Sequence, residues 1–200
     1  MKKYLCIAVF SISTFQYALA QQPSVKDLYF DFTNYRMSQE NKEDVLRKSL
    51  ILLSQKNELT VKQQANVNYH IGRLYEETGA PEKSVPYYEE TIALSPAYYV
   101  PYRALAFINV KKCNEFGVKI NDAAKQKNAE IHNQALADYK KQVLKTIPYL
   151  EKAQACDPDD ETLTMLVKYY KSIKANEALE KLPEKLKKLA ENCITLLDDE

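Results

Sequence analysis

The residue types that most often carry catalysis or bind metal ions are sparse in this sequence. Its two histidines, His70 and His132, have no second ligand type at a metal-site spacing such as H-E-x-x-H. Because zinc needs three or four converging ligands, we expect no metal site. Neighbouring carboxylates occur at residues 76–77, 89–90 and 159–160. We interpret them as solvated helix faces or as charges at helix starts.

The sequence also lacks the glycine-rich loops that bind phosphate groups. It has three glycines in 200 residues, and none belongs to a G-x-S-x-G, Walker-type or G-x-G-x-x-G motif. We therefore expect no catalytic residue, no cofactor and no enzyme activity.

The cysteines do not form an obvious framework. Beyond Cys6 there are three, Cys113, Cys156 and Cys193, which are far apart and form no C-x-x-C pair. This pattern argues against a disulfide scaffold and against a metal site. We interpret the three as small apolar residues on helices, although the sequence leaves open whether any two of them pair.

The first 20 residues have the layout of a secretory signal peptide. Lys2 and Lys3 give a positive start, residues 5–12 are almost all apolar, and residues 18–20 read Ala-Leu-Ala. A transmembrane helix is the alternative, but the apolar run is shorter than the roughly 20 residues that a bilayer requires. We predict cleavage after Ala20, which gives an exported chain, periplasmic or secreted, with no membrane span after cleavage.

Charge and composition narrow the class of protein further. Cleavage would leave 26 basic and 27 acidic residues, a balance that argues against a dedicated binder of nucleic acid or anionic membranes. Few glycines, abundant Lys, Glu, Leu and Ala, and no alternating strand pattern together predict an all-α protein.

Two segments are similar enough to predict an internal repeat. "SVPYYEETIALSPAY" (84–98) and "TIPYLEKAQACDPDD" (146–160) both begin with a small residue, a branched apolar residue, Pro-Tyr and then a glutamate two residues on. In each segment a second proline follows the first after ten residues. Repeats of this kind favour a stacked architecture.

Residues 65–98 resemble the tetratricopeptide repeat, a helix-turn-helix unit of about 34 residues. The recurring positions of that family are filled here by Ile71, Gly72, Tyr75, Gly79, Ser84, Tyr88 and Pro96. Asn68 and Thr91 depart from the family pattern, in which Trp and Ala are usual. The resemblance implies a right-handed α-superhelix of antiparallel helix pairs.

This unit accounts for residues that would weaken one long helix. We expect Gly72 to let the first helix approach its partner closely, and Gly79 to end that helix in a left-handed conformation. Pro81 would open the second helix, and Pro86 would lie about one turn in, near amides that lack helical partners.

Residues 99–160 form a second, longer unit. Its 62 residues are 28 more than a standard unit of about 34. From the additional material, about residues 117–142, into the helix that follows it, an apolar residue recurs at every fourth position: Ile131, Ala135, Tyr139, Val143 and Ile147. We predict one elongated pair, a long antiparallel hairpin that bends near residues 117–122. Over residues 65–195 the chain resembles a group of exported Bacteroidetes repeat proteins with a long insertion before "IPYLEKA…DP".

The two ends are less regular. Residues 21–64 are predicted to form a degenerate helix pair, with helices at 24–36 and 43–54. Residues 161–200 are predicted to form capping helices, whose face rich in lysine and glutamate suits contact with solvent.

The resemblance also implies a concave groove lined by the first helix of each unit. Its candidates by position are Asn66, Tyr69, His70, Arg73 and Glu77, then Val100, Arg103, Ala104, Phe107 and Lys111. Tyr, Phe and Arg are enriched at protein interfaces, although such residues also face solvent or a neighbouring helix.

Among the groove candidates, the arginines define the expected ligand. Arg73 and Arg103 would suit an acidic or aromatic peptide, unless Glu76 and Glu77 neutralise them. The carboxylate clamp known in the family needs Lys and Asn where this chain has Tyr69 and Arg73, so we do not expect that activity.

Of fifteen tyrosines, we expect Tyr75 and Tyr88 to fill the core and Tyr149 to fill it in part.

Taken together, these features predict a non-catalytic protein- or peptide-binding module in the cell envelope. The alternative is a structural or accessory subunit whose long hairpin supports association, including self-association. The partner, the biological process and the oligomeric state are left open.

Overall fold

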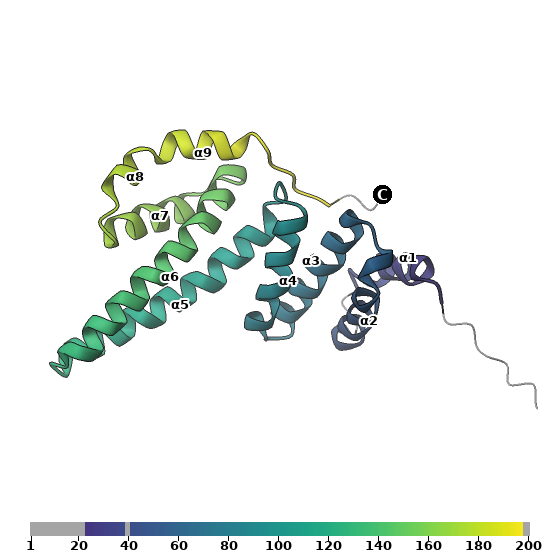
Figure 1. Ribbon diagram of the computed structural model, residues 1–200, viewed down its shortest axis with the longest axis horizontal. Helices are drawn as coiled ribbons and strands as arrows, with labels where there is room; N and C mark the ends of the chain where they lie inside the picture. The colour runs from purple at the N-terminus through teal and green to yellow at the C-terminus, as the bar shows by residue number, and fades with distance from the viewer. Residues whose placement is uncertain (1–22, 39–40, 198–200) are drawn as a thin grey trace, which may run out of the picture.

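The computed structural model describes residues 23–38 and 41–197, and these ranges are all-α (Figure 1). They contain nine α helices and the short 3-10 helix Lys56–Glu58. The α helices are α1 (Val25–Tyr35), α2 (Lys42–Ser54), α3 (Val61–Glu77), α4 (Pro81–Leu94), α5 (Val100–Lys125), α6 (Ala129–Cys156), α7 (Asp160–Ser172), α8 (Asn176–Glu180) and α9 (Leu182–Ala190). None of these helices is long and apolar enough to cross a bilayer.

Successive helices pack as hairpins that follow one another in a row, with α5–α6 the longest (Figure 1). The all-α class is confirmed, as are helices at the two predicted N-terminal positions. The tetratricopeptide arrangement stays a prediction, and the predicted signal peptide (1–20) lies outside the described residues.

Local chemistry sets the ends of α3 and α4. Thr60 and Gln63 cap the start of α3 reciprocally, each side chain accepting a hydrogen bond from the backbone of the other. Gly79 has φ +80°, the left-handed conformation expected after a helix, and Pro81 is the first residue of α4. The predicted roles of Gly79 and Pro81 are therefore confirmed.

The close approach at Gly72 involves a side chain, and not the backbone of the second helix. A β-carbon at Gly72 would lie 2.6 Å from Cε1 of Tyr88. Tyr88 is fully buried as predicted, and Tyr149 is half-buried as predicted. Tyr75 is only half-buried, because its ring stacks on Tyr87 near the surface with 5.5 Å between centroids.

Two prolines lie inside helices. Pro86 is the sixth residue of α4, so it is past the amides that lack partners, and the reason predicted for its tolerance is wrong. Without an N–H it cannot donate to the carbonyl of Glu82. Pro148 lies far inside α6. Buried residues flank both prolines: Ser84 and Tyr88 lie around Pro86, and Ile147 and Leu150 lie around Pro148. Burial of these side chains can compensate for one lost hydrogen bond in each helix.

The hairpin bends later than predicted. α5 continues through Gly117 to Lys125, and α6 begins at Ala129. Lys127 takes the left-handed conformation (φ +53°), and the side chain of Asn128 caps α6 by accepting from the amide of Ile131. An interior glycine costs a helix only about 1 kcal/mol. The turns of α5 after Gly117 pack against α6, and this contact offsets the cost of the glycine. The helix α5 therefore continues past Gly117 and ends just before the capping residue Asn128.

The predicted apolar stripe of α6 is mostly correct. Ala135, Val143 and Ile147 are buried and Tyr139 is half-buried, whereas Ile131 is 52% exposed near the end of the hairpin. The stripe therefore packs where neighbouring helices lie against it, and its first residue remains uncovered.

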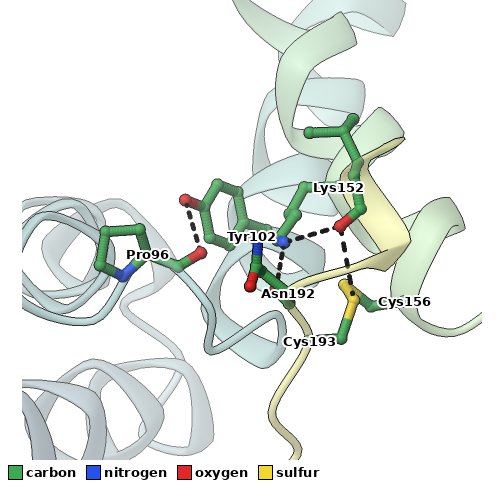
Figure 2. Close-up of a disulfide and its surroundings, with 7 residues drawn as sticks. Pro96, Tyr102, Lys152, Cys156, Asn192 and Cys193 are labelled. Carbon is green, nitrogen blue, oxygen red and sulfur yellow. Dashed lines mark hydrogen bonds between the residues drawn. A yellow bond between two sulfur atoms is a disulfide. The ribbon is translucent and has the colours of Figure 1, made fainter. Parts of the chain in front are cut away.

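The C-terminal cap differs from a simple helix pair, because α8 and α9 are separate and residues 191–197 are non-helical. Cys156 at the end of α6 forms a disulfide with Cys193, with Cα atoms 5.6 Å apart (Figure 2). The interpretation of all three cysteines as plain apolar residues is thus wrong for two of them. It holds for Cys113, which is buried and free. Packing of α9 on α6 brings together sulfurs that are 37 residues apart.

Candidate protein-binding surfaces

Part of the predicted groove is covered by the chain itself. Asn66 and His70 on α3 are buried beneath side chains of α1. The Asn66 amide donates to the Tyr29 hydroxyl at 3.4 Å, and the Phe32 ring meets His70 edge-on at 5.6 Å between centroids. These two candidates are contacts within the fold and do not line an open surface.

Arg73 is held by partners inside the chain. Its Nη1 lies 2.6 Å from Oε1 of Glu77, and its Nη2 donates to the backbone carbonyl of Arg36. The Nζ of Lys42 lies 3.0 Å from the other oxygen of Glu77. The neutralisation of Arg73 by Glu77, which the sequence left as an alternative, is therefore what the structure shows. The network joins the end of α1 and the start of α2 to α3.

Arg103 is neutralised by a different pair of carboxylates. Its guanidinium lies 2.6 Å from Asp157 and 3.4 Å from Asp159, both just after α6. Glu76 does not contribute, since it accepts a hydrogen bond from the Tyr88 hydroxyl. The two arginines are thus engaged separately and do not form an open site for an anionic peptide.

The remaining groove candidates divide between core and surface. Tyr69 is half-buried, with its ring centroid 5.1 Å from those of His70 and Tyr98. Phe107 is 39% exposed beside Arg103, and Lys111 is exposed with Nζ 3.7 Å from Glu82. The structure therefore leaves Phe107 and Lys111 as the accessible part of the groove.

A further hollow lies elsewhere, between α5 and α6 near the end of the hairpin. Its volume is about 920 Å³. Phe116, Ala123 and Ile131 provide apolar walls, and α7 covers only the other end of the hairpin (Figure 1). The sequence did not predict this surface, because the apolar stripe with a spacing of four residues indicated that Ile131 packs inward. The sequence did contain one sign of an uncovered end: the stripe continues beyond the length of a standard unit, where no neighbouring helix was predicted to cover it.

The rim of the hollow carries more negative than positive charge. Asp122, Glu130 and Asp138 line it together with a single cation, Lys119. The Lys119 ammonium stands 5.1 Å from the centre of the Phe116 ring. A cationic group that entered beside Ile131 would meet these carboxylates at short range.

Within residues 23–38 and 41–197, no three His, Cys, Asp or Glu side chains converge in a way that could hold a metal ion.

Comparison with protein-family models, with curated proteins and with solved structures finds no match to this chain. The resemblance to the tetratricopeptide repeat therefore rests on the residues named above.

Proposed function

We propose that this chain is a non-catalytic protein-binding module of the tetratricopeptide type, and that its partner binds at the far half of the α5–α6 hairpin. The observation that carries the proposal is the hollow of about 920 Å³, with the half-exposed Ile131 beside Phe116. Figure 1 shows this half of the hairpin extending beyond α7. Exposed apolar surface next to a polar rim is characteristic of protein interfaces.

The charges around the hollow specify the partner's chemistry. Asp122 is already 3.5 Å from Lys125, whereas Glu130 has no ion pair in the described parts of the chain and Asp138 accepts only from Gln134. The fitting partner is a protein segment that presents an apolar side chain next to Lys or Arg. The apolar group would contact Ile131, and the cation would pair with Glu130 or Asp138.

A charge-reversal variant tests this surface. A source membrane extract is passed over chain starting at residue 21, and the captured protein is purified so that its affinity can be measured. Glu130→Lys with Asp138→Lys should weaken binding by at least about tenfold at low salt and leave helix content unchanged. Phe30→Ala, which removes a 67% exposed side chain on α1, is the matched control and should bind normally. Unchanged affinity in the double variant would exclude the hollow.

The groove remains a second candidate because Phe107 is exposed beside Arg103. Removing the 28 additional residues of the hairpin separates the two surfaces. If the captured protein still binds the shortened chain and is lost with Phe107→Ala, the groove is the site. Light scattering of the unchanged chain and of the shortened chain decides whether a second copy is the occupant, which is the self-association form of the accessory-subunit alternative.

Location in the cell envelope is part of the proposal. A disulfide between Cys156 and Cys193 is consistent with an oxidising compartment, since cytosolic thiols are usually kept reduced. Mass spectrometry of the native protein should find a chain that begins after Ala20. A cytosolic chain that still begins at Met1 would contradict export.

A further inference from the structure

Residues 191–197, the C-terminal segment that follows α9, pair with the connection between α4 and α5. The amide of Ile194 donates to the carbonyl of Ala97 at 2.9 Å, and the amide of Tyr99 donates to the carbonyl of Ile194 at 3.4 Å. These bonds form a parallel bridge between Tyr98 and Ile194. In Figure 1 the segment runs from α9 past this connection. One residue of the C-terminal segment thus occupies a short main-chain edge.

The edge is held in place by contacts that do not involve Ile194. Tyr98 is buried against Tyr69, and its amide donates to the carbonyl of Ser95. The hydroxyl of Tyr102 donates to the carbonyl of Pro96 at 3.2 Å (Figure 2). Ala97 and Tyr99 are left to present one carbonyl and one amide on the same side. A preorganised edge loses little conformational entropy when an extended segment pairs with it.

The anchors of the C-terminal segment lie before Ile194. The Lys152 ammonium, on the last turns of α6, donates to the carbonyls of Leu189 at 3.1 Å and Asn192 at 2.7 Å. Cys193 is bonded to Cys156 (Figure 2). Among residues 195–197, which follow Ile194, Leu196 is 80% exposed. Two surface hydrogen bonds that compete with water do not order such a segment alone, so Ile194 is kept at the edge by these anchors. The disulfide is the covalent one among them, and it can be opened chemically.

We propose that the main chain of Ala97 and Tyr99 is a docking edge for an extended apolar segment of a partner protein. Ile194 of the same chain occupies the edge while the Cys156–Cys193 disulfide is closed, and opening the disulfide exposes it. The occupant is specified by its backbone and by a short apolar run like residues 194–197. This site is separate from the hairpin hollow, so it stands or falls independently of the proposed function.

The opening step is thiol–disulfide exchange with a dithiol reductant. One thiolate of the dithiol attacks a sulfur of the disulfide, which forms a mixed disulfide and releases the other cysteine as a thiolate. The second thiol of the reductant then displaces the remaining cysteine. Two electrons pass from the dithiol to the cysteine pair, two protons reach Cys156 and Cys193, and the reductant leaves as a disulfide.

Amide hydrogen exchange tests the closed and open states. In the chain with Cys156→Ser and Cys193→Ser, the Ile194 amide should exchange at least about tenfold faster than in the oxidised chain. The amides of α5 and α6 should stay protected relative to the unfolded chain, although they share the global loss of stability. A labelled peptide of residues 192–197 with Cys193→Ser should bind this variant at least about tenfold more tightly than the oxidised chain. Equal protection of Ile194 in both chains, or equal peptide affinity, would overturn the proposal.

A matched pair of substitutions tests the edge itself. Tyr99 has φ −82° and follows a bridge residue, so Tyr99→Pro removes the amide with little strain. Tyr99→Ala removes the same side chain and keeps the amide. Placed in the double serine variant, Tyr99→Pro should bind the peptide at least about tenfold more weakly than Tyr99→Ala. Equal binding would show that the edge does not hold the peptide. A dimer of the reduced chain that the peptide dissociates would make the occupant a second copy and overturn its assignment to a partner.

Discussion

The ring of Tyr88 lies so close to Gly72 that no β-carbon fits between α3 and this side chain. The ideal β-carbon position is 2.6 Å from Cε1 and 2.8 Å from Cδ1 of the ring. The Tyr88 hydroxyl continues along α3 and donates to Glu76. The absence of a side chain at Gly72 therefore leaves the space that the Tyr88 ring fills, and this contact fixes the position of α4 on α3.

Gly72→Ala should destabilise the fold by about 1–3 kcal/mol, because a buried ring has to move to admit the methyl group. Urea unfolding followed by circular dichroism measures this. Gly117→Ala is the control: no heavy atom lies within 4 Å of the added carbon, so this helical site should gain up to about 1 kcal/mol. A similar loss at both positions would show that the Tyr88 contact is not the cause.

The hydrogen bond to a buried carboxylate on α6 should contribute to the stability of the fold. Glu151 is almost fully buried, accepts a hydrogen bond from Tyr170 and lies 2.6 Å from Nζ of Lys185. Tyr170→Phe leaves one acceptor without its donor and should cost about 1–3 kcal/mol in denaturant unfolding. Tyr139→Phe is the matched control, since that hydroxyl bonds Ser172 at an exposed position and its loss should be near neutral. Equal losses of unfolding free energy in Tyr170→Phe and Tyr139→Phe would show that burial of Glu151 does not make its hydrogen bond more important.

The disulfide should stabilise the folded chain. Cys156→Ser with Cys193→Ser frees a loop of 37 residues, for which the chain-entropy model gives about 4 kcal/mol. Thermal unfolding of oxidised protein and of the variant, both without reductant, measures the difference. If the oxidised protein and the variant melt together, the bond contributes nothing to the global transition and constrains only the C-terminal segment.

Thiol counting checks the cysteine assignment directly. Oxidised chain starting at residue 21 should present one thiol after unfolding, from Cys113. In the folded state this thiol should react slowly, because it is buried and burial raises its pKa. Cys113→Ala should abolish the signal. Three thiols in the unfolded, unreduced chain would contradict the disulfide.

Asp159 should make stability depend on pH in the acid range. Thr162 donates to it through the backbone amide at 2.8 Å and through the hydroxyl at 2.7 Å, with Arg103 nearby, and these contacts lower the pKa of Asp159. The unfolded chain then binds more protons, so the stabilisation is present above the ordinary aspartate pKa, about 3.9. It is lost as pH falls through the lower, folded pKa.

Asp159→Asn retains an acceptor for the helix cap and removes the titration, so its unfolding free energy should vary less between about pH 5 and pH 2. Asp160→Asn, at the exposed neighbouring position, makes the same change in net charge and is the control. Guanidinium unfolding at several pH values measures both. Identical profiles for Asp159→Asn and the unchanged chain would exclude the carboxylate as the source.

Much of the secondary structure follows from neighbours close in the sequence. Gly79 and Pro81 mark the turn between α3 and α4 because left-handed and helix-opening conformations are properties of those residues themselves. Composition and periodicity likewise predicted the helices, including the long α5–α6 pair. The bend of that pair was misplaced, since the weakness of Gly117 is local whereas its cost is offset by contacts with α6.

The sequence by itself therefore determined the helical class, most helix positions and the absence of recognised catalytic motifs. Only the tertiary structure decided that α1 buries Asn66 and His70, that Asp157 neutralises Arg103, and that Cys193 reaches Cys156. Each of these outcomes depends on which distant segments come into contact. A residue's type sets what it can bind, but its partner is set by packing of helices far apart along the chain.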